Sequence, residues 1–117
     1  ATPELIKLLS DEQLSGNAAR SLGSIGPAAQ EAIPELIAFI EANKEKNKQR
    51  YHWPSYTAIE ALGKMGEAAK PAVPLLVQMH ASENETIKRA SATALWKIDP
   101  AAAKQAGAEE PTEEDEE

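Results

Sequence analysis

The chain has 117 residues, of which 42% are hydrophobic and none is Cys, with 12 basic against 19 acidic residues and a net charge of −7. This length fits one domain with a folded core, and it excludes a full Rossmann or barrel enzyme. The composition excludes disulfides and Cys-ligated zinc, argues against a general nucleic-acid binder, and leaves no apolar run near the ~20 residues that span a membrane.

Hydrophobic spacing predicts an all-α fold, because apolar residues recur with the helical period and no segment shows the period-2 alternation of a strand. The expected helices cover residues 2–9, 12–25, 28–46, 54–65, 68–80 and 85–98. Pro34 and Pro74 fall at equivalent places, where a proline fits near a first turn or at a kink. Asn84 and Ser55 are expected to begin the helices that they precede.

A repeat of about 31–33 residues runs through the chain, as expected for stacked two-helix units. Residues 17–40 match residues 57–80 at an offset of 40, with nine identities that include Leu22/Leu62 and Gly23/Gly63. A further copy follows at an offset of 33, and the start of the chain fits at an offset of 31. One such unit cannot bury its apolar face alone. The pattern therefore predicts an α-α superhelix (solenoid) of about three two-helix repeats over residues 1–107.

Two segments carry a resemblance to a known family. Residues 61–66 (Ala-Leu-Gly-Lys-Met-Gly) and 87–90 (Ile-Lys-Arg-Ala) resemble the small HEAT-like repeats of bacterial proteins, which are armadillo-type α-solenoids. The resemblance covers nearly all of residues 1–103. It implies a protein-interaction scaffold and not an enzyme, and a minority of the family, the accessory subunits of tetrapyrrole-attaching lyases, provides an alternative. The first unit lacks its opening turn, which is expected of a fragment of a longer repeat array.

The end of the chain differs sharply from the repeats. Residues 1–107 hold equal numbers of basic and acidic residues, so the seven acidic residues from Glu109 to Glu117 carry the whole net charge. A segment of like charge without an apolar anchor cannot offset its ordering entropy. We therefore expect a disordered acidic tail over residues 108–117. It is either an interaction segment or a solubilising end.

A basic and aromatic insertion at residues 44–56 is the first candidate for partner binding. Three of the five aromatic residues of the chain lie within six positions, directly after a basic run. Tyr and Trp supply contact area with few rotatable bonds, and Arg supplies directed donors. The predicted contacts are Arg50, Tyr51, Trp53 and Tyr56. In the alternative interpretation, residues 44–50 only extend the preceding helix and Trp53 packs beneath the loop.

The second candidate is the face formed by the second helices of the units, called here the second-helix face. Its register predicts six exposed residues that contact a partner, namely Arg20, Ile59, Glu60, Lys64, Arg89 and Lys97. With Ile59 pointing outward, this face would form a shallow apolar groove rimmed by charge, suited to a helix or an extended peptide. The alternative is an ordinary solvated face with one stray Ile.

No pattern predicts a catalytic, metal or cofactor site. His52 and His80 lie in different units, neither has a second His at i+3 or i+4, and the acid nearest to His80 is Glu83, so the partner ligands of a metal site are missing. The sequence therefore favours a non-enzymatic module that binds a protein or peptide partner. Nucleic-acid binding through the basic run is disfavoured by the neutral body and the acidic tail. Bacterial cytoplasm and periplasm fit a Cys-free chain equally well, so the compartment stays open.

Overall fold

From α1 to α7, helices follow one another in pairs along the described part of the chain. The computed structural model describes residues 2–11, 13–44, 53–82 and 84–110, and these residues contain helices and no strand. The elements are α1 (Thr2–Leu8), α2 (Ser15–Ile25), the 3₁₀ segment η1 (Gly26–Ala32), α3 (Ile33–Ala42), α5 (Trp53–Lys64), the 3₁₀ segment η2 (Gly66–Ala72), α6 (Val73–His80), α7 (Glu85–Ile98) and α8 (Pro100–Gln105).

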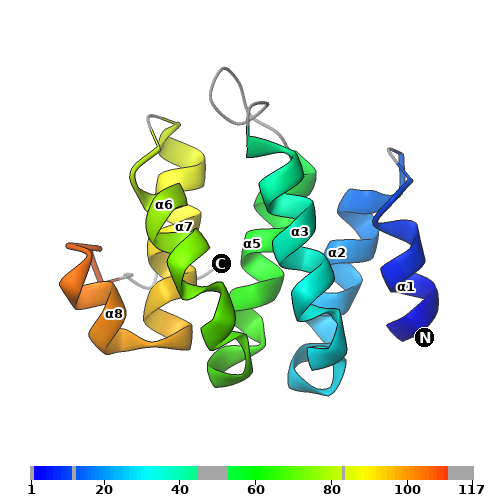
Figure 1. Cartoon of the computed structure of the whole chain (residues 1–117), viewed down its shortest axis with the longest axis horizontal. Helices are drawn as coiled ribbons and strands as arrows, with labels where there is room; N and C mark the ends of the chain where they lie inside the picture. Colours follow the sequence, from blue (N-terminus) through cyan, green and yellow to red (C-terminus); the bar gives the residue numbers. More distant parts are fainter. Residues whose placement is uncertain (1, 12, 45–52, 83, 111–117) are drawn as a thin grey trace.

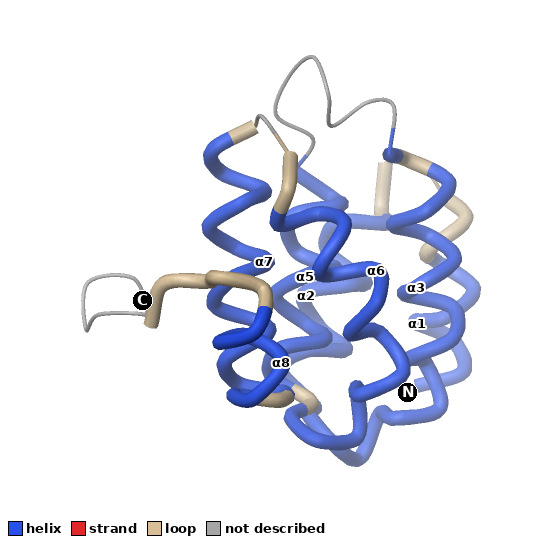
Figure 2. The backbone as a smooth tube through the Cα atoms, turned by 60° about the vertical axis from the view of Figure 1, so that its left-hand side comes forward, coloured by secondary structure: helices blue, strands red, loops and turns tan. Residues whose placement is uncertain are grey.

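The helices form two layers, as Figures 1 and 2 show. The second helices α2, α5 and α7 make one layer, in which α5 packs against α2 on one side and α7 on the other. The first helices α1, α3 and α6 make the other layer, and each packs on the second helices of the stack. This arrangement confirms the predicted all-α solenoid of two-helix units.

Two helices of the first-helix layer, α3 and α6, begin later than the sequence pattern predicts. The expected helices at 28–46 and 68–80 each open with a 3₁₀ segment, and in η1 the backbone of Ala29 (φ −98°, ψ 21°) is not helical. Pro34 and Pro74 lie at the first positions of α3 and α6, where the missing N–H costs no helical hydrogen bond. Gly26 and Gly66 have positive φ, which lets the chain leave the preceding helix sharply.

One of the two expected helix starts is confirmed. Oδ1 of Asn84 accepts hydrogen bonds from the backbone N–H of Thr86 at 3.0 Å and of Ile87 at 3.3 Å, which caps α7. Ser55, by contrast, does not start a helix. It lies fully buried inside α5, which begins two residues earlier at Trp53.

A short helix that the sequence pattern did not predict covers the end of the stack. Asp99 ends α7 and caps α8, since its Oδ1 accepts a hydrogen bond from the N–H of Ala102 at 3.3 Å. Nε1–H of Trp96 donates to the carbonyl of Ala108 at 3.0 Å, and Ala108 is buried. The packed chain therefore continues through Ala108. The predicted disorder of the tail concerns residues that lie mostly outside the described ones.

Small residues let the second helices approach one another closely. A Cβ built on Gly23 would lie 2.9 Å from Cα of Ala61, and one built on Gly63 would lie 3.1 Å from Cα of Ala94. Real Cβ contacts are rarely this short, so both positions favour glycine. The repeat thus places a glycine of α2 against an alanine of α5, and a glycine of α5 against an alanine of α7.

One side of the first unit is exposed to solvent, whereas the corresponding side of the later units is covered. Ile25 is 38% exposed, whereas Met65 and Ile98 at the same repeat position are each 1% exposed. In the later units the neighbouring helices cover this position. In the described residues α2 has a second helix, α5, on one side alone.

This difference predicts unequal costs for the same truncation. Met65→Ala is expected to lower the free energy of unfolding by about 2–4 kcal/mol, because it leaves a cavity in the core. Ile25→Ala should cost less than about 1 kcal/mol, because its side chain already contacts water. Urea denaturation followed by circular dichroism measures both values. Equal costs would contradict the difference in burial between the two positions.

Candidate functional site

A groove of about 360 Å³ lies between α5 and α7 on the second-helix face. From α5 it is lined by Tyr56, Glu60, Gly63 and Lys64, and from α7 by Glu85, Thr86, Arg89, Ala90, Thr93, Ala94 and Lys97. These residues recur at intervals of three and four, which places them on one face of each helix. The groove therefore follows from the helical period together with the close packing of α5 on α7.

The floor and the rims of the groove differ in chemistry. The floor consists of small residues, Gly63, Ala90 and Ala94, because only these allow the two helices to approach. The rims carry long charged side chains of both signs and the half-buried ring of Tyr56. Such a groove offers room for a backbone along its floor and directed polar contacts along its edges.

Two lysines extend back across the preceding helix. A Cβ built on Gly63 would lie 3.7 Å from Cδ of Lys97, and one built on Gly23 would lie 3.5 Å from Cδ of Lys64. The aliphatic stems thus cover backbone that has no side chain of its own, while both residues stay exposed overall. Packing of the stem restricts where the ammonium group of each lysine can lie.

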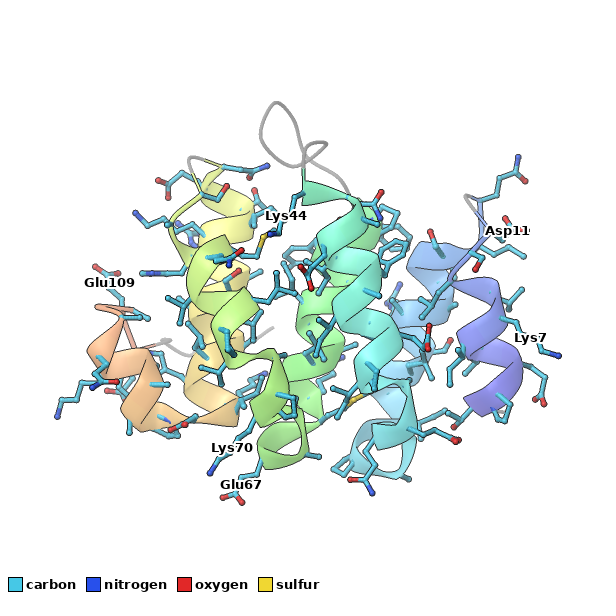
Figure 3. All side chains as sticks on the ribbon, in the orientation of Figure 1. Lys7, Asp11, Lys44, Glu67, Lys70 and Glu109 are labelled. Atoms are coloured by element: carbon cyan, nitrogen blue, oxygen red, sulfur yellow. The ribbon has the colours of Figure 1, made fainter. Side chains whose placement is uncertain are left out.

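The structure brings together half of the predicted contact residues. Those that line the groove are Tyr56, Glu60, Lys64, Arg89 and Lys97. Arg20 is exposed on α2 but does not line the groove. Arg50 and Tyr51 lie outside the described residues. The basic run before them begins at Lys44, whose Nζ donates to Oε1 of Gln78 on α6 at 2.9 Å (Figure 3).

The prediction for Ile59 is wrong. Its side chain is 0% exposed and belongs to the core, and Ala19 and Ala92 at the matching repeat positions are also buried, at 0% and 8% exposure. The reason is that a middle second helix contacts neighbours on both sides as well as the first-helix layer, which leaves a narrower exposed stripe than a helix at a free surface. The groove therefore has a small-residue floor instead of an apolar Ile.

Trp53 packs on the neighbouring repeat although it is 38% exposed. Its ring occupies the space that a Cβ on Gly16 would need, and Oγ1 of Thr57 donates to the carbonyl of Gly16 at 3.1 Å. These contacts join the start of α5 to the start of α2, so Trp53 has a packing role against α2, whereas the loop beneath which the alternative interpretation placed it lies outside the described residues. Its role in partner binding stays a prediction.

A second hollow, of about 580 Å³, lies over α3 and η2 on the other layer. It is mainly apolar, with Ile33, Pro34, Ile37 and Pro71 in its lining and Glu41 at its edge. The sequence analysis missed this hollow, because it interpreted Pro34 only as a residue of a first turn or a kink and did not consider Pro71. The proline and aliphatic residues at the start of α3 could have indicated an apolar surface there.

The described part of the chain contains neither a metal-binding cluster nor a membrane-spanning helix. No group of three His, Asp or Glu side chains there could hold a metal ion. Among the helices whose placement is described, none has both the length and the apolar character to cross a membrane.

Comparison with known proteins decides the family. The sequence model of the HEAT repeats matches residues 2–96. The chain belongs to the HEAT-repeat family. Proteins of this family are generally interaction scaffolds and typically not enzymes, while the likeness to bacterial members stays a prediction. No curated protein and no solved structure matches the chain significantly.

The corrected position of Ile59 leads to a prediction for stability. Ile59→Asp places a carboxylate in the core without a partner, so the free energy of unfolding should fall by about 4 kcal/mol or more. Glu60→Ala, one position away on the groove, should change it by less than about 0.5 kcal/mol. Thermal unfolding followed by circular dichroism compares the two. An Ile59→Asp chain as stable as the parent would contradict the register of α5.

Proposed function

We propose that this HEAT-repeat chain is a non-enzymatic protein-interaction module that binds a peptide segment of a partner in the groove between α5 and α7. The observation that carries the proposal is the groove itself, in which a floor of small residues lies between two charged rims. The membership of the chain in a family of interaction scaffolds supports the same function.

The lining of the groove suits a peptide backbone. Small floor residues leave space for a main chain, and Thr86 and Thr93 offer hydroxyl groups to its polar atoms. Tyr56 supplies a half-buried aromatic surface at one end, of the kind that contributes strongly to interfaces. A partner would therefore be held by its backbone and by a few side chains at the rims.

Other predicted contacts extend this proposal. Arg20 on α2 lies on the same layer of helices and is available to a longer partner. Trp53 contributes exposed ring surface near the start of α5. Arg50 and Tyr51 remain predicted contacts outside the described residues. No specific observation favours the alternative roles as an accessory subunit of a tetrapyrrole lyase or as a nucleic-acid binder.

A selection from random peptides tests the proposal. Peptides that enrich on the intact chain are expected to lose roughly tenfold or more of their affinity when Thr93→Trp fills the groove. Val77→Ser, a change of an exposed apolar residue on α6 in the other layer, is the matched control and should leave affinity within about twofold. Isothermal titration measures both affinities.

The selection can also contradict the proposal. If no peptide enriches, or if the enriched peptides bind the Thr93→Trp chain as tightly as the parent, the groove is not the binding surface. Circular dichroism of both variants confirms that the comparison is made between folded chains.

A further inference from the structure

The charges on the rims of the α5–α7 groove are arranged unevenly along its length. The lining contains three cations, Lys64, Arg89 and Lys97, and two carboxylates, Glu60 and Glu85. The excess is locally positive, although the whole chain carries a net charge of −7. A groove with a positive lining favours negatively charged ligands.

The two lysines lie at the same end of the groove. Lys64 is in the last turn of α5 and Lys97 is in the last turn of α7. They occupy equivalent positions in consecutive repeats, so the stacking that aligns the two helices also aligns the two ammonium groups. Arg89 lies two turns before Lys97, and Glu85 and Tyr56 mark the opposite end.

These charged groups are available to a ligand. Within the described part of the chain, the structure records no ion pair for any of the five charged residues on the rims. The stems of Lys64 and Lys97 are already packed beside Gly23 and Gly63, so binding a carboxylate orders fewer rotatable bonds than it would for a fully free lysine.

We propose that the α5–α7 groove binds an acidic segment of a partner protein, with carboxylates on Lys64 and Lys97 and a further polar contact to Arg89. The inference rests on the proposed function and names the chemistry of the partner. A basic segment fits the groove less well than an acidic one, because Lys64 and Lys97 would repel it at their end of the groove.

The length of the groove sets the size of the segment. Helix α5 has 12 residues and α7 has 14. A helix of that size is roughly 18–21 Å long at 1.5 Å per residue. An extended peptide covers this distance with about six residues. A short acidic stretch is therefore sufficient to reach from Tyr56 to the two lysines.

The acidic tail of the same chain has similar chemistry and starts nearby. Residues 106–110 lead from α8 past α7 toward the second-helix face (Figure 2), with the carbonyl of Ala108 bonded to Trp96. Glu109 and Glu110 are exposed there. Occupation of the groove by the tail is a distinct outcome that the experiment must separate from binding of a partner.

Fluorescence anisotropy with labelled peptides tests the inference on the full chain. The probe is a peptide of alternating Glu and Ser, about eight residues long so that it spans the groove, and its counterparts carry Gln or Lys in place of every Glu. The Glu peptide should bind at least about tenfold more tightly than either counterpart, and less tightly as salt rises from about 0.05 to 0.3 M.

Paired variants separate the groove from the general charge of the chain. Lys64→Gln with Lys97→Gln is expected to weaken binding of the Glu peptide by roughly tenfold. Lys70→Gln with Lys88→Gln removes the same charge from exposed residues that do not line the groove and should change binding by less than about twofold. Figure 3 shows Lys70 near Glu67, at the lower end of the stack. Lys64→Arg with Lys97→Arg should keep the binding and reports on correct folding.

The outcomes are distinguishable. Equal binding of the Gln or Lys peptide, still lost in Thr93→Trp, would overturn the acidic partner and leave the proposed function standing. Loss of every groove-dependent peptide would remove both. If the Glu peptide binds only after the five acidic residues of 113–117 are replaced by Gln or Asn, the tail fills the groove and the inference is overturned. An equal effect of the two lysine pairs would overturn it as well.

Discussion

The close approach of neighbouring second helices is the constraint on which the rest of the structure depends. Gly23 faces Ala61 and Gly63 faces Ala94, and in each pair a single added methyl group would come within about 3 Å of backbone. This contact sets the distance between units and brings the aliphatic side chains of adjacent repeats into one core. In α7, Trp96 stands at the repeat position of this glycine and donates its Nε1–H to the carbonyl of Ala108, and α8 packs on α7.

The groove is a consequence of the same contact. Because the helices touch through Gly63, Ala90 and Ala94, the long side chains on either side stand above a low floor. The absence of side chains at Gly23 and Gly63 also leaves room for the stems of Lys64 and Lys97. The residues that pack α5 on α7 therefore also line the proposed binding surface.

Much of the fold could be predicted from the sequence, because the repeat itself encodes it. The spacing of Leu22 and Leu62 and the matched glycines indicated both the helices and their stacking. The 3₁₀ segments and α8 were missed, since they depend on local backbone geometry and on Asp99 serving two helices at once. Four groove residues, Glu60, Lys64, Arg89 and Lys97, could be predicted from register, and Tyr56 from the cluster of aromatic residues. Ile59 could not, because its exposure depends on how many neighbours surround α5, and a helical period does not give that number.

The most direct test of the close-packing constraint is the free energy of unfolding of Gly23→Ala, measured by urea denaturation. In an exposed helix this substitution stabilises by about 1 kcal/mol, because Ala is the better helix former. Here the added Cβ would meet the backbone of Ala61 at 2.9 Å, so the account predicts a net loss of about 1 kcal/mol or more. A gain in stability would show that the second helices are not held at this distance and would contradict the account.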